Sequence, residues 1–149
     1  MVSIENLSTN EIEQQFVKTF VISQIRNRVI YELTSSKKRR SFFSRLSYKP
    51  ILLLKAEFMI KVPQLRVEQE ISEITSMLIA RGAKNKCYVM SYIQEIDRTI
   101  FPLKEGVQAC VNCSMETVLV CNEKLAFFQS EQVLGSPPRF LLHKKLKFC

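Results

Sequence analysis

Two cysteines, Cys110 and Cys113, form the one compact cysteine motif of this 149-residue sequence. Thiols at this spacing can form a redox pair or supply half of a tetrahedral zinc site. A redox pair commonly uses a helix N-terminus to stabilise a thiolate, whereas Cys110 falls towards the end of a predicted helix. A zinc site would need further ligands, for which Cys87, Cys121 and His143 are scattered candidates. We therefore expect buried structural cysteines, with no metal and no cofactor.

Other residues suited to acid–base chemistry do not form a recognisable motif. The single histidine, His143, is followed by Lys144 and Lys145, which oppose its protonation, and no motif places a nucleophile beside it. Acidic residues between positions 68 and 73 fit the solvated face of a predicted helix. The chain has three glycines, which excludes a glycine-rich phosphate loop. The sequence contains no catalytic signature, and we expect a protein that is not an enzyme.

The formal net charge of +8 is concentrated in two short segments that contain no acid. Six cations lie within residues 35–49 and four within residues 139–149, while the rest of the chain has 12 basic and 14 acidic residues. We expect a basic loop over 35–49 and a basic C-terminal tail over 139–149. The positive fields of the two segments add only if they lie within a Debye length of about 8–10 Å.

Aromatic residues are interleaved with the cations of the predicted loop, at Phe42, Phe43 and Tyr48. Cations neutralise phosphates and rings stack on bases, which is a combination suited to single-stranded nucleic acid. A solvated loop whose phenylalanines pack inward is the more common outcome for such a segment. A contact with a membrane surface or with a protein is a third interpretation.

Our leading hypothesis is a small basic binding module that engages a polyanion, with nucleic acid as the preferred partner. Its predicted contact residues are Lys37, Lys38, Arg39, Arg40, Arg45, Lys49, Lys144, Lys145 and Lys147. The alternative is a protein-interaction or assembly subunit that docks a protein partner, or a second copy, through an apolar helix or sheet face. An enzyme that uses the cysteine pair is the third hypothesis.

The helices and strands follow from apolar spacing and turn residues. Ser8 and Glu11 have capping-box spacing, and the apolar stripe that follows predicts a long amphipathic helix over 10–33. This stripe would pack on the protein's own sheet or form a dimerisation face. Further helices are predicted over 65–81, ended by Gly82, and over 103–111. Strands are expected over 51–62, 87–93 and 99–101, in a hairpin of 117–121 with 125–128, and at a sheet edge over 139–142.

This element order predicts a single α+β domain over residues 1–149. We expect a mixed or antiparallel sheet, with the long N-terminal helix and one or two further helices packed largely on one face. The N-terminal residues do not resemble a secretory signal, and no apolar run approaches the ~20 residues of a transmembrane helix. Together with an odd number of cysteines, this predicts a cytoplasmic protein with reduced thiols.

Overall fold

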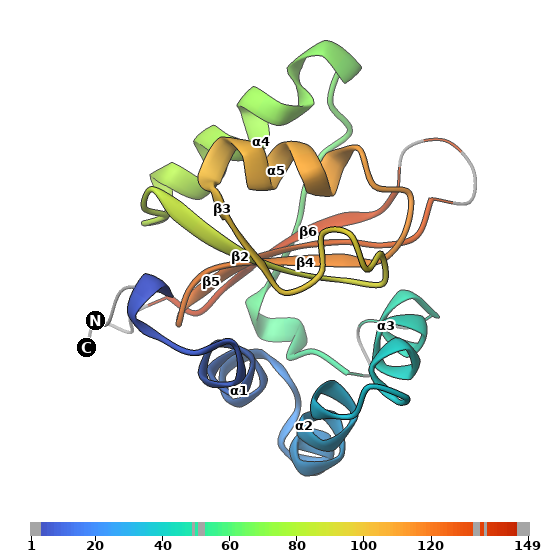
Figure 1. Cartoon of the computed structure of the whole chain (residues 1–149). Coiled ribbons are helices and arrows are strands. Elements are labelled where there is room, and N and C mark those ends of the chain that lie inside the picture. The colour runs from blue at the N-terminus through green and yellow to red at the C-terminus, as the bar shows by residue number, and fades with distance from the viewer. Residues whose placement is uncertain (1–3, 49, 51–52, 133–134, 136, 146–149) are drawn as a thin grey trace.

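The centre of the protein is one antiparallel sheet of six strands, in the order β1-β6-β5-β4-β2-β3 (Figure 1). The structure is a computed structural model that describes residues 4–48, 50, 53–132, 135 and 137–145. Neighbouring strands are antiparallel throughout. The strands are β1 (Met59–Lys61), β2 (Lys86–Ser91), β3 (Thr99–Pro102), β4 (Thr117–Asn122), β5 (Leu125–Gln129) and β6 (Arg139–His143).

Helices cover both faces of this sheet (Figure 1). On one face lie α4 (Glu70–Ala80) and α5 (Leu103–Val111), and on the other lie α1 (Thr9–Phe20), α2 (Arg26–Thr34) and α3 (Arg39–Tyr48). Buried side chains form two apolar clusters accordingly. The predicted α+β class is confirmed, but the helices divide between the two faces instead of lying largely on one. Strands β4 and β5 are buried along their whole apolar length, so both of their faces need cover.

The segment predicted as one helix over 10–33 is two helices separated by an extended residue, Val21. Val21 forms an isolated β-bridge with Leu54, and the N–H of Lys55 donates to the carbonyl of Phe20 at 2.8 Å. These bonds take the chain out of helical geometry although the apolar spacing continues. The predicted capping box is confirmed, because the N–H of Glu11 donates to Ser8 Oγ at 3.2 Å.

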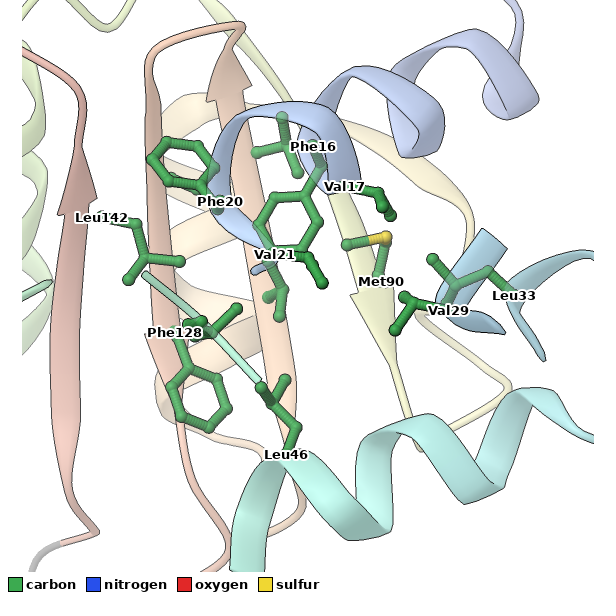
Figure 2. Packing of buried hydrophobic residues seen from close by; sticks show 14 of the residues in the cluster. Phe16, Val17, Phe20, Val21, Val29, Leu33, Leu46, Met90, Phe128 and Leu142 are labelled. Atoms are coloured by element: carbon green, nitrogen blue, oxygen red, sulfur yellow. The ribbon is translucent and has the colours of Figure 1, made fainter. Parts of the chain in front are cut away.

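The apolar stripe of α1 and α2 packs on the protein's own sheet, as the first of the two interpretations expected. Phe16 and Phe20 of α1 and Val29 of α2 are at most 1% exposed. They lie over side chains of the sheet that include Met90 of β2 and Phe128 of β5 (Figure 2). The stripe is therefore not available as a dimerisation face.

The segment predicted as a basic loop over 35–49 contains helix α3, so this prediction is wrong for the greater part of its length. Phe42, Phe43 and Leu46 are fully buried and attach one side of α3 to the core. The helix was missed because its apolar side is short and lies among cations and serines. Lys49 lies outside the described residues.

Most of the remaining elements agree with the sequence prediction. The helices predicted over 65–81 and 103–111 are present as α4 and α5, and the predicted hairpin is present as β4 and β5. Gly82 follows α4 with a φ of 109°, as a C-cap glycine does. Within the predicted strand over 51–62 only Met59–Lys61 is a strand, and residues 51–52 lie outside the described residues. β6 is not an edge strand, because it lies between β1 and β5.

No helix in the described part of the chain has the length and apolarity to cross a membrane.

Candidate nucleic-acid interface

Arg39, the first residue of α3, is buried and fully committed to partners within the protein. Its guanidinium donates two hydrogen bonds of 2.7 Å to Glu13 and two of 2.8 Å to Asp97. The fifth N–H donates to the carbonyl of Leu33 at 3.0 Å. Burial lowers the pKa of Arg39, but the bonds and charges of Asp97 and Glu13 outweigh it and raise that pKa above its ordinary value. Because all five N–H groups are used, Arg39 has none left for a phosphate.

The network around Arg39 joins elements that are distant in sequence. The buried hydroxyl of Tyr88 on β2 donates to Glu13 of α1, and burial, together with that carboxylate, raises the pKa of Tyr88. The N–H of Ser91 donates to Asp97 at 2.9 Å, and Arg98 Nη2 donates to the carbonyl of Leu33 at 2.9 Å. The network thus fixes the start of α3 to α1, to the end of α2 and to the turn between β2 and β3.

Arg45 is also paired within the protein. Its guanidinium donates to the carboxylate of Glu32 on α2, and Arg28 Nε lies 3.9 Å from the same carboxylate. The Glu32 side chain is only 8% exposed, so its charge is partly shielded from water. We conclude that Arg45 mainly holds α3 against α2, and that its net contribution to an external field is small.

Lys37, Lys38 and Arg40 remain exposed at the start of α3. No ion pair within the described part of the chain involves these three cations. Arg40 stacks on the ring of Tyr92, with 5.0 Å from its Cζ to the ring centroid. We define the α3 surface as the exposed residues Lys37, Lys38, Arg40, Ser41 and Ser44.

One cation beside this surface was missed by the sequence analysis. Arg98 has a side chain that is 41% exposed, and its bond to the Leu33 carbonyl places it near the turn that precedes α3. It lies in a segment of mixed charge that also contains the exposed Glu95. Charge counting along the chain could not find it, because the contact depends on how β2 and β3 meet the helices.

Of the three aromatic residues in this segment, only Tyr48 is exposed, at 82%, so the segment does not present a platform of successive rings for bases. Phe42 and Phe43 are 0% exposed, which agrees with the interpretation in which the phenylalanines pack inward. Single-stranded nucleic acid is held largely by stacking of bases on exposed rings. The α3 surface instead presents ammonium, guanidinium and hydroxyl groups, which are donors suited to phosphate oxygens.

The predicted basic tail over 139–149 is not one surface: Arg139 begins β6, is buried and pairs with Glu70, whereas Lys144 and Lys145 follow β6 at the end of the strands opposite α3. The Ser47 hydroxyl lies 3.0 Å from that of Ser130, just after β5, whereas the N–H of Lys144 donates to the carbonyl of Lys124, just before β5. A strand of this length spans about 17 Å, which exceeds the Debye length of about 8–10 Å. The two basic segments therefore do not form one continuous field. Lys147 lies outside the described residues.

The four cysteines in the described part of the chain show no arrangement for redox or metal chemistry. Cys87, Cys110 and Cys121 are buried, and burial raises the pKa of each thiol, that of Cys87 to about 12. Cys113 is half-buried, and its sulfur accepts a bond of 3.4 Å from the Thr117 hydroxyl. The described residues contain no group of three side chains that could hold a metal ion. A raised pKa disfavours the thiolate that redox or nucleophilic chemistry requires.

Comparisons with protein-family models, with curated proteins and with solved structures find no match for this chain.

Proposed function

We propose that this protein is a non-enzymatic nucleic-acid-binding module that contacts the phosphate backbone through the α3 surface. The observation that carries the proposal is the exposure of Lys37 and Lys38 just before α3 and of Arg40 on α3, without ion pairs among the described residues. The other side of α3 is fixed in the core. Because α3 is already held by the Arg39 network, binding does not have to order the helix.

The form of nucleic acid that this surface fits best is a duplex. Two of the three rings predicted to stack on single-stranded bases, those of Phe42 and Phe43, are buried, and only Tyr48 is exposed. Residues 35–38 connect α2 to α3, a connection of the length found in helix–turn–helix units, whose second helix approaches duplex DNA. Lysine, arginine and serine contacts to phosphates position a protein on a duplex without reading its sequence. We therefore expect binding that is independent of sequence, with Kd in the range of about 10⁻⁴ to 10⁻⁶ M at physiological salt.

A residue-resolved titration tests the proposal. The ¹⁵N-labelled protein is titrated with a random duplex of about 20 base pairs at about 50 mM salt. We expect the backbone amides of Lys38, Ser41 and Ser44 to shift together and saturate. The triple variant Lys37→Ala, Lys38→Ala, Arg40→Ala should lose these shifts while keeping the dispersed spectrum of a folded protein.

The matched control removes the same charge from exposed sites outside the α3 surface: Lys18→Ala, Lys61→Ala and Arg66→Ala. This control should keep the shifts along α3. The absence of shifts along α3 in the wild-type protein, or their persistence in the α3 variant, would contradict the proposal.

A further inference from the structure

A second group of cations comes together at the end of the strands opposite α3. It contains Arg81 and Lys84, which follow α4, Lys124 in the β4–β5 turn, and Lys144 and Lys145, which follow β6. Two hydrogen bonds join these segments: the Asn122 amide donates to the Gly82 carbonyl at 3.4 Å, and the Lys144 N–H donates to the Lys124 carbonyl at 2.9 Å. We call these five cations the edge surface.

The charge of the edge surface is largely uncompensated. Lys84, Lys144 and Lys145 are exposed, and no ion pair within the described part of the chain involves any member of the surface. Glu123, in the same hairpin turn as Lys124, offsets one of the five positive charges. Cations that are held close together by such hydrogen bonds repel one another unless an external anion compensates them.

His143 lies beside the cations of the edge surface. This residue ends β6 beside the edge surface, and its Nδ1 is buried without a hydrogen-bond partner among the described atoms. Its pKa is lowered first by burial and then by the positive charges of Arg81 and Lys145. The imidazole therefore lies in the field of two members of the edge surface, Arg81 and Lys145.

We propose that the edge surface is a second phosphate-binding surface for nucleic acid, so that one chain holds two nucleic-acid segments at once. Its cations extend from β6 to the chain before β2, across three strand spacings or about 14 Å, which suits a polymer with repeated phosphates better than a single phosphate group. The two surfaces lie at opposite ends of the strands, so a segment on one does not cover the other. The proposal that the edge surface binds nucleic acid does not depend on the α3 surface, whereas bridging also rests on the proposed function of the α3 surface.

A capture assay tests bridging directly. Beads that carry one duplex are incubated with protein and with a second, fluorescent duplex, and the captured fluorescence is measured. The edge variant is Lys84→Ala, Lys144→Ala, Lys145→Ala. It removes three charges, as do the α3 variant and the control described above. We expect capture by the wild type and the control, and at least a fivefold loss for both the edge and α3 variants.

Direct binding of each variant to one duplex separates the two proposals. The edge and α3 variants should each still bind a single duplex, with residual shifts confined to the intact surface. An edge variant that captures as well as wild type would overturn the inference, since bridging would then come from a dimer using α3. If the α3 variant loses all duplex binding, the edge surface is not a site, although the proposed function stands. If the α3 variant behaves as wild type, the proposed function and bridging both fail.

Discussion

The guanidinium of Arg39 binds the carboxylate of Glu13 in bidentate fashion, through two hydrogen bonds of 2.7 Å from Nη1 and Nη2. The next residue, Arg40, is exposed and stacks on Tyr92. Two consecutive arginines in one basic run thus have different tasks. Arg39 attaches α3 to the rest of the fold, and Arg40 belongs to the surface that we propose for phosphate binding.

Replacing Arg39 should destabilise the fold much more than replacing Arg40. Arg39→Ala leaves the buried carboxylate of Glu13 and the half-buried carboxylate of Asp97 without their partner, and we expect a loss of about 3–5 kcal/mol in the free energy of unfolding. Arg40→Ala removes one exposed cation–π contact and should cost about 1 kcal/mol or less. Urea denaturation measures both values.

A second substitution covers the case in which Arg39→Ala does not fold. Arg39→Lys keeps the positive charge but cannot form the planar, two-sided set of bonds, so it should also be less stable than Arg40→Ala. Equal stabilities for the Arg39 and Arg40 variants would show that the buried network is not what holds α3.

Glu116 should make stability depend on pH in the direction opposite to an ordinary ion-paired acid. The residue is 3% exposed, and its Oε2 has no hydrogen-bond partner among the described atoms. Burial raises its pKa above the ordinary value of 4.5. The folded state therefore binds this proton more tightly than the unfolded state, and the contribution of Glu116 to stability increases as the pH falls from 7 through its raised pKa.

Glu116→Gln removes this titration while keeping the shape of the side chain. The variant should be more stable than wild type at pH 7, and this advantage should shrink as the pH approaches 4.5. Denaturation of both proteins across this pH range gives the difference. A difference that stays constant with pH would mean that Glu116 has the same pKa in the folded and unfolded states.

Alkylation of the native protein should distinguish the cysteines. Cys87, Cys110 and Cys121 are buried with raised pKa values, so we expect them to react about tenfold or more slowly than the half-buried Cys113. Peptide mass spectrometry after a short exposure to iodoacetamide measures each rate, and the denatured protein serves as the control. Rapid modification of Cys110 would revive the hypothesis of a reactive cysteine pair.

Local patterns in the sequence predicted many of the elements but not how they meet. The capping box at Ser8, the glycine after α4 and the hairpin turn depend on a few neighbouring residues, and all three are present. The break at Val21 depends on its bridge to Leu54, which apolar periodicity does not contain.

The prediction of the nucleic-acid-contacting residues was limited in the same way, because it used local charge and not contacts between distant residues. Counting charge identifies a basic segment, but it does not show that Arg39 bonds Asp97, which is 58 residues away. It also assigns Lys144 to the same interface as Lys37 and Lys38, although the structure places Lys144 beside Lys124. The exposed cations could be separated from the paired ones only after the fold was known.

The salt dependence of duplex binding, followed through the backbone amides of Ser41 and Ser44, tests directly whether the α3 surface contacts phosphates. Contacts from Lys37, Lys38 and Arg40 to three phosphates predict a slope of about −2.7 in log K against log salt, and a loss of about 40-fold between 50 and 200 mM. A slope near zero at these amides, or no binding at the lowest salt, would contradict the central claim.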